Sequence, residues 1–211
     1  MSRLRGDNLK SYHHGDLKNA LIEAGIALLY EQGKEQFSLR KVAAKCGVSH
    51  AAPYSHFQNK EALMEAMQQH VTKQFVQVLQ KTVEKHKNDL DIMLFLGNAY
   101  ITFFMEHKTY FSFLYEHSGL QFDFSEDGIV NNMYTPCTIF KRAAFELMEK
   151  IDFPKEKRID ALLAMLVLVH GITAMLTTQQ ITYEGDWKNI LKNSITANAL
   201  FAGMIQKRRE N

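Results

Sequence analysis

Apolar residues recur at three- and four-residue steps along most of the chain. This spacing predicts helices, because residues three and four positions apart share one face of a helix. Few segments alternate apolar and polar residues in the way of a strand, and the chain has only three prolines. We therefore predict an all-α fold of about nine helices.

Capping residues and glycines divide the first part of the chain into four helices. A capping side chain accepts a free amide hydrogen of the first turn, and glycine readily adopts the left-handed conformation that ends a helix. The expected caps are Asp16, Ser38, Ser49 and Asn59, and the expected ends are Gly33 and Gly47. The predicted helices are 17–32, 39–46, 50–56 and 60–85, the last of which links two domains, 1–60 and 61–211.

Five further helices are expected at 92–107, 109–117, 129–150, 154–180 and from Asp186 to about residue 209, with a loop at 118–128. The most apolar window, 161–176, is interrupted by polar residues and glycine and is shorter than the roughly 18 apolar residues of a membrane span. We interpret it as a buried helix. The first ten residues have no apolar run behind them, so we expect no signal peptide and a cytoplasmic protein.

Two cysteines, Cys46 and Cys137, lie far apart and belong to no C-x-x-C pair. They indicate neither a disulfide framework nor a zinc site, and a reducing compartment fits them. We expect no metal, no cofactor and no membrane segment.

The segment 38–63 has the pattern of a helix-turn-helix. Such a motif needs a tight turn between two short helices, so that the second helix can enter the major groove of DNA. Gly47 supplies the turn, and Tyr54 and Phe57 are expected to pack the second helix against its neighbours. The side chains expected to point outward are His50, Ala51, Ala52 and Ser55.

This segment resembles the DNA-binding domain of TetR-family regulators. The family pattern is a Thr/Ser-capped helix, Ile/Val-Ala, Gly-Val-Ser and then Tyr-x-x-Phe-x-x-Lys-x-x-Leu. The residues in register are Ser38, Val42, Ala43, Gly47, Val48, Ser49, Tyr54, Phe57, Lys60 and Leu63. With the Tyr-His-His-Gly-Asp-Leu lead at 12–17, the likeness covers residues 12–67.

The lead and the run Ala51-Ala52-Pro53-Tyr54 are similar to one subgroup of the family, whereas most members have Gly-x-(Leu/Ile/Val)-Tyr in place of that run. Val169-His170-Gly171 resembles a Trp-x-x-x-His-Gly motif of the C-terminal domain found in that subgroup, although Leu166 stands where the tryptophan is expected. For His170, a buried ring satisfied by its neighbours is the alternative to a contact with a ligand.

The resemblance implies DNA-binding residues. Ser38, Arg40, Tyr54 and Lys60 are candidates for phosphate contacts. The exposed residues of the second short helix are candidates for base contacts. The full predicted set is Ser38, Arg40, Ser49, His50, Ala51, Ala52, Tyr54, Ser55 and Lys60. Alternatively, Tyr54 is a packing residue and Lys60 is merely solvated.

The charge distribution adds a weaker indication of DNA binding. The net charge is only +2, but residues 1–60 hold nine Lys or Arg against five Asp or Glu. A basic N-terminal region suits a polyanion such as DNA. The alternative is that the charges of a solvated surface are unevenly distributed by chance. Arg3, Arg5 and Lys10 form either an arm that contacts DNA or an idle tail.

The second domain is rich in aromatic residues and methionine. Most such stripes form ordinary cores, but in TetR-like proteins this region is a helical bundle around an apolar effector pocket, which adaptable side chains suit. The predicted lining residues are Phe104, Phe111, Tyr115, Phe140 and His170. The last two helices have excess apolar surface, which predicts a homodimer.

The resemblance therefore implies a repressor that binds a near-palindromic double-stranded DNA operator and is released by a small apolar effector. An enzyme is a rival interpretation, but the sequence contains no Gly-rich phosphate loop, G-x-S-x-G elbow or H-E-x-x-H motif. The other rival is a helical ligand-binding or scaffold protein that does not bind DNA.

Overall fold

Eight α-helices make up most of the computed structural model, which describes residues 14–119, 135–178, 183–197 and 209–210. No strand occurs among these residues, and the predicted all-α fold is confirmed. The chain divides into two compact units, Met1–Met67 and Gln68–Asn211, and the division falls inside α3 (Lys60–His86).

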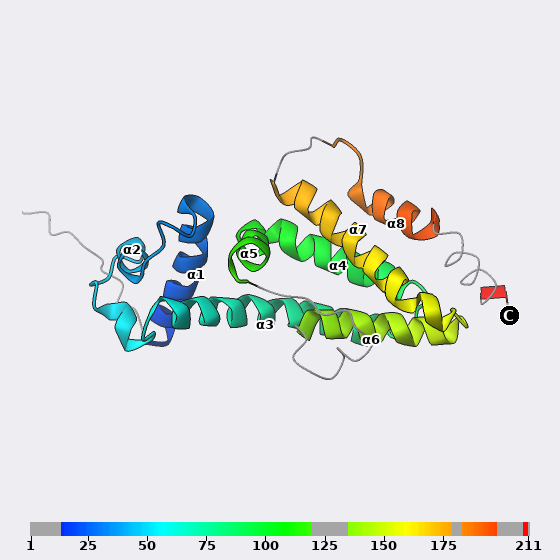
Figure 1. Ribbon diagram of the computed structural model, residues 1–211, viewed down its shortest axis with the longest axis horizontal. Coiled ribbons are helices and arrows are strands. Elements are labelled where there is room, and N and C mark those ends of the chain that lie inside the picture. The colour runs from blue at the N-terminus through cyan, green and yellow to red at the C-terminus, as the bar shows by residue number, and fades with distance from the viewer. Residues whose placement is uncertain (1–13, 120–134, 179–182, 198–208, 211) are drawn as a thin grey trace, which may run out of the picture. The chain divides into compact units, whose positions relative to one another are not determined.

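The N-terminal unit consists of α1 (His14–Gln32), α2 (Leu39–Lys45), the short 3₁₀ helix η1 (Ala52–Ser55) and the start of α3. Helix α2 packs against both α1 and η1 (Figure 1). The core of this unit contains Leu21, Ile26, Leu29, Phe37, Val42, Ala43, Phe57, Leu63 and Met67. A small helical core of this kind holds the turn between α2 and η1 in place.

Of the four predicted helix caps of this unit, Ser38 and Asn59 are confirmed, and the helix starts predicted at Asp16 and Ser49 are wrong. The side chain of Ser38 accepts the amide hydrogen of Lys41 at 3.3 Å. Asn59 Oδ1 accepts the amide hydrogen of Ala62 at 2.8 Å. Asp16 is not a cap, because α1 already begins at His14. Helix boundaries read from a sequence commonly err by this much, since more than one residue near an end can serve as a cap.

The C-terminal unit continues α3 and adds α4 (Ile92–Glu106), α5 (Lys108–Ser112), a π-helical turn η2 (Phe113–His117), α6 (Thr135–Lys150), η4 (Lys155–Lys157), α7 (Arg158–Thr178) and α8 (Trp187–Ala197). Helix α4 packs against α6, α7 and α8. It is therefore the central helix of the bundle (Figure 1).

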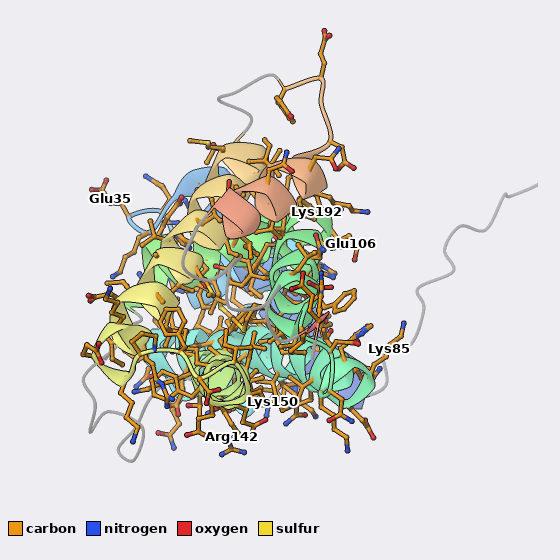
Figure 2. The ribbon with its side chains drawn as sticks, turned by 90° about the vertical axis from the view of Figure 1, so that its right-hand side faces the viewer. Glu35, Lys85, Glu106, Arg142, Lys150 and Lys192 are labelled. Carbon is orange, nitrogen blue, oxygen red and sulfur yellow. The ribbon has the colours of Figure 1, made fainter. Side chains whose placement is uncertain are left out.

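Aromatic rings fill the middle of this bundle. The ring of Phe75 on α3 lies 5.3 Å from that of Tyr100 and 4.9 Å from that of Phe104, measured between centroids. All three side chains are at most 2% exposed. Charged side chains such as Glu106 and Arg142 are exposed and point outward (Figure 2). The aromatic residues of this domain thus largely form its core.

Helix α7 departs from the expectation of a buried helix. Leu163, Val167 and Met175 are 40%, 63% and 52% exposed. Four-residue steps place these side chains on one face, so the helix has an apolar face that the described residues leave exposed. By length and composition alone, residues 155–178 also form one helix that is long and apolar enough to cross a membrane.

Several predicted segments lie partly outside the described residues. These are the basic arm with Arg3, Arg5 and Lys10, the Tyr12-His13 start of the lead, most of the loop 118–128, the start of the helix 129–150, and the ends of the last two helices.

Candidate DNA interface and effector site

A tight turn follows α2. Gly47 has a φ of +68°, in the left-handed region that glycine adopts without the steric cost of a Cβ atom. Behind it, the amide of Val48 donates to the carbonyl of Ala43 at 3.1 Å. The predicted turn at Gly47 is confirmed, and the chain leaves α2 directly into the segment that resembles a recognition helix.

That segment is more tightly wound than the sequence predicted. Instead of an α-helix over 50–56 capped by Ser49, the structure has a 3₁₀ helix at Ala52–Ser55 whose N-cap residue, Ala51, makes no side-chain capping hydrogen bond. Pro53 lacks an amide hydrogen and cannot donate the hydrogen bond that an α-helix would use. The segment closes with hydrogen bonds between residues three apart.

The side chains of this segment divide into buried and exposed sets. Pro53 and Phe57 are buried, and Phe57 packs into the core as expected. Tyr54 is 53% exposed, so the expectation that it packs against neighbouring helices is wrong. The other exposed residues are Ser49, His50, Ala51 and Ser55, and Ala52 is partly exposed. The tyrosine ring and these five small or polar side chains are therefore at least partly accessible.

The candidate phosphate contacts flank this surface along the chain. Ser38 caps α2 and Arg40 in its first turn is exposed. Lys60 at the start of α3 is half-buried, and its Nζ donates to the carbonyl of Lys34 at 3.3 Å and lies 5.3 Å from the centre of the Phe37 ring. Lys60 thus braces the connection between α1 and α2 and is not simply solvated.

Two other cations of α2 are engaged with α1 or the connection after it. Lys45 forms an ion pair with Glu31 at 2.7 Å. The ammonium group of Lys41 donates to the side-chain oxygens of Gln32 and Gln36. These partners hold α2 against its neighbour, and the sequence reasoning did not foresee them.

In the C-terminal unit, two of the predicted effector residues meet in a polar cluster. The hydroxyl of Tyr100 donates to that of Tyr115 at 2.7 Å and lies 3.2 Å from Nδ1 of His170. The His170 ring also lies 5.2 Å from the ring of Phe111. Burial lowers the pKa of His170 from its ordinary value, because desolvation disfavours the charged imidazolium.

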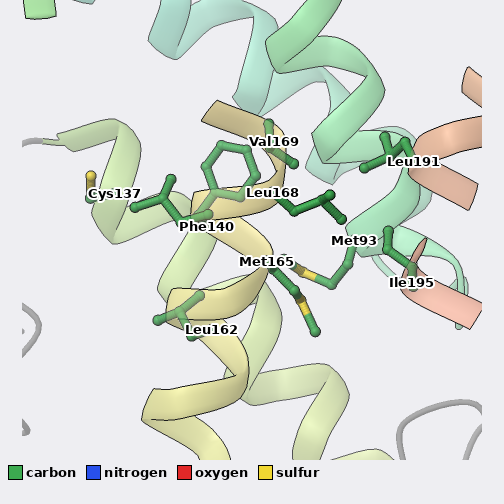
Figure 3. A pocket seen from close by; sticks show the side chains of 10 residues that line it. Met93, Cys137, Phe140, Leu162, Met165, Leu168, Val169, Leu191 and Ile195 are labelled. Carbon is green, nitrogen blue, oxygen red and sulfur yellow. The ribbon is translucent and has the colours of Figure 1, made fainter. Parts of the chain in front are cut away.

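A separate apolar pocket lies between α4, α6, α7 and α8 (Figure 3). Its lining residues are Met93, Cys137, Phe140, Leu162, Met165, Leu166, Leu168, Val169, Leu191 and Ile195. Its free volume is about 20 Å³, which is room for little more than one water molecule. Burial raises the pKa of the Cys137 thiol to about 12. The pocket is small and apolar, and none of its lining residues is charged.

Of the five predicted effector residues, only Phe140 lines this pocket. Phe104 and Phe111 are buried in the aromatic core. The sequence reasoning missed the methionines and aliphatic residues of α4, α7 and α8, because apolar periodicity identifies an inward face but not the point at which packing leaves a gap. Within the described residues, no group of three His, Cys, Asp or Glu side chains is arranged to hold a metal ion.

The sequence profile of the bacterial regulatory proteins of the tetR family matches residues 21–67, the stretch that contains the turn at Gly47 and the exposed surface around Tyr54. This stretch of the chain is therefore similar to the DNA-binding domain of the tetR family. The proteins of that family are described as bacterial regulatory proteins, so the match favours a regulator over the enzyme interpretation.

Two tetR-family relatives match the same domain. The tetracycline repressor protein class G of Vibrio anguillarum is 44% identical over 50 residues, which are 24% of this chain and 24% of that protein. The class A tetracycline repressor from transposon 1721 of Escherichia coli is 43% identical over 49 residues, or 23% of each chain. The match thus spans about a quarter of the length of these relatives.

Solved structures share the fold over nearly the whole chain. A protein of unknown function from Rhodococcus sp. RHA1 aligns with a TM-score of 0.70 at 22% identity, over 92% of this chain and 98% of that one. A TetR-family transcriptional regulator from Haemophilus influenzae aligns with a TM-score of 0.63 at 18% identity, over 85% and 94%. The fold of these structures, a helix-turn-helix followed by a helical domain, is therefore shared over both units.

Proposed function

We propose that this chain is a cytoplasmic, ligand-responsive repressor that binds operator DNA as a homodimer. The observation that carries the proposal is the accessible surface of the tightly wound segment after Gly47. Tyr54 in this segment is 53% exposed, whereas Pro53 and Phe57 are buried and anchor the segment to the core. An exposed aromatic side chain with a hydroxyl suits a phosphate contact, and the small residues beside it suit close approach to base edges.

The DNA contacts fall into two groups. Ser38, Arg40, Tyr54 and Lys60 contact phosphates and set the orientation of the domain. The exposed residues after the turn face the major groove and carry sequence preference. These are Ser49, His50, Ala51, Ala52 and Ser55.

The proposed dimer uses α7 and α8. Leu163, Val167 and Met175 form an apolar stripe on α7, and Ile190 on α8 is also exposed, at 36%. Covering such a stripe with its two-fold copy removes apolar surface from water, and the resulting four-helix arrangement places two DNA-binding units on a near-palindromic site. Val167→Glu should yield a folded monomer in ultracentrifugation, whereas Tyr30→Glu, at an exposed aromatic residue of the other unit, should leave the dimer intact.

The proposed effector is small and apolar. The pocket between α4 and α7 has no charged lining residue, and its two methionines, Met93 and Met165, can change rotamer to enlarge the small space. A ligand that binds an opened form more tightly shifts the population toward it, and operator affinity falls by the differential affinity of the ligand for the two forms. Helix α3 is shared by both units and is the proposed lever.

The deciding experiment selects duplexes from a random DNA library with the full-length protein. The proposal expects one near-palindromic sequence, bound ~10³-fold or more above random DNA, with affinity that falls steeply as salt rises. A protein without duplex preference at low salt would instead be a helical ligand-binding or scaffold protein.

A further inference from the structure

The winding of the segment after Gly47 sets which side chains stand side by side. Its hydrogen bonds run from the amides of Ala52, Tyr54 and His56 to the carbonyls of Ser49, Ala51 and Pro53. In a chain with three residues per turn, side chains three apart are eclipsed. Ala51 at the N-cap therefore lines up with Tyr54 in one row, and Ala52 lines up with Ser55 in a second row. Both rows are at least partly exposed.

No arginine or lysine occurs between residues 47 and 59. The commonest specific contact to DNA is a bidentate bond from Arg or Lys to guanine O6 and N7, and this segment cannot make it. Besides Tyr54, which is proposed to contact a phosphate, the exposed rows offer the methyl groups of Ala51 and Ala52 and the hydroxyl of Ser55. An alanine methyl is suited to the C5-methyl group of thymine, which protrudes into the major groove.

The hydrogen of the Ser55 hydroxyl is already engaged in a hydrogen bond. Its Oγ donates to the carbonyl of Ala52 at 2.7 Å. A serine hydroxyl has one hydrogen and two lone pairs, so while this bond persists Ser55 can only accept from a base. The base groups that donate in the major groove are the N6 amino group of adenine and the N4 amino group of cytosine.

We infer that this surface reads A·T base pairs, with Ala51 and Ala52 against thymine methyl groups and Ser55 accepting from the amino group of adenine. The two features occur together only in an A·T pair, which presents the thymine methyl and the adenine amino group in the same groove. The inference rests on the proposed DNA binding and names what that binding recognises. The half-site should therefore contain consecutive A·T pairs at the positions that face these residues.

The test begins with the duplex selected from the random library. Each thymine of a half-site is replaced in turn by uracil, which removes only the C5-methyl group. Loss of one buried methyl contact should weaken binding of the wild-type protein roughly four-fold at one or two positions. Positions outside the contacted pairs serve as controls and should show no change.

Matched variants then assign the contact to a residue. In Ala51→Gly or Ala52→Gly, the uracil penalty should vanish at one of these positions, because the partner methyl is already gone. In Ala44→Gly, at an exposed alanine of α2, the penalty should remain roughly four-fold. Replacing adenine by purine, which lacks the amino group, should weaken the wild type but not Ser55→Ala.

The outcomes separate this inference from the proposed function. Failure to select any preferred duplex overturns both. A preferred duplex that tolerates uracil at every position, or a uracil penalty that persists in both glycine variants, leaves the repressor proposal standing and overturns the reading of thymine methyl groups. A selected half-site of G·C pairs would do the same.

Discussion

The hydroxyl of Tyr100 lies 3.2 Å from Nδ1 of His170, in the interior of the C-terminal unit. Tyr100 is 2% exposed, and its ring packs edge-on against Phe104 and Phe140. The same hydroxyl donates to Tyr115 at 2.7 Å. One buried hydroxyl therefore joins three segments, α4, η2 and α7, within an otherwise aromatic core.

Tyr100→Phe tests how much this junction contributes to the free energy of unfolding. The substitution keeps the ring and removes a hydrogen-bonding partner from two polar groups in a largely apolar setting, which should cost about 1–3 kcal/mol. Urea titration followed by circular dichroism measures the change. Tyr30→Phe, at a residue that is 51% exposed, is the control and should match the wild type. Equal stability of Tyr100→Phe would show that the junction has no energetic role.

His170 should make the stability of the fold depend on pH. Burial lowers its pKa in the folded state below the ordinary value of 6.5, so the unfolded chain binds a proton more readily. The contribution of neutral His170 is therefore fully present above that value and is lost as the pH falls below it. The urea midpoint of the wild type should drop more between about pH 7.5 and about pH 5.5 than that of His170→Gln. Identical drops in the two proteins would contradict this role.

Gly97 permits the close approach of α4 to α7 and α8. A Cβ atom at this position would lie 3.0 Å from Leu191 Cδ2 and 3.2 Å from Val169 Cγ2, closer than carbon atoms normally pack. Val169 is stiff at χ1, so the helices must separate. Gly97→Ala should lower the free energy of unfolding by about 1–3 kcal/mol despite the better helix propensity of alanine.

Gly171→Ala is the matched control for Gly97→Ala. It is a glycine in the middle of α7, and a Cβ atom there would meet nothing within 4 Å. Helix propensity then acts alone and should raise stability by up to about 1 kcal/mol. A destabilised Gly171→Ala together with a neutral Gly97→Ala would mean that packing around α4 has been misjudged.

The sequence predicted the helix-turn-helix well because its determinants are local. Ser38, Gly47 and Asn59 act on amides and dihedral angles within a few residues of themselves, and each behaves in the structure as its chemistry predicts. The 3₁₀ winding after the turn was missed. In a segment this short, three- and four-residue periods cannot be told apart from side-chain pattern, and Pro53 is compatible with either.

The C-terminal unit was predictable as a bundle but not as a site. Phe104 and Phe140 look alike in the sequence, yet one is fully buried and the other lines the apolar pocket. The difference depends on how residues such as Leu191, 51 positions after Phe140, fill the space around them. Such long-range packing leaves no local signature. Excess apolar surface on the last two helices was predicted, but not that Leu163, Val167 and Met175 form the exposed stripe of α7.

Lys60 and Tyr54 should separate phosphate binding from stability. Lys60 donates to the carbonyl of Lys34 and lies over the Phe37 ring, so Lys60→Ala should both weaken operator binding and lower the free energy of unfolding by about 1 kcal/mol. Tyr54 is 53% exposed, so Tyr54→Phe should weaken binding and leave stability unchanged. Losing a cation that contacts a phosphate should also reduce the slope of log affinity against log salt by about one, whereas losing a neutral hydroxyl should not. Operator titrations at several salt concentrations measure both effects, and an unchanged slope in Lys60→Ala would restrict that lysine to its bracing role.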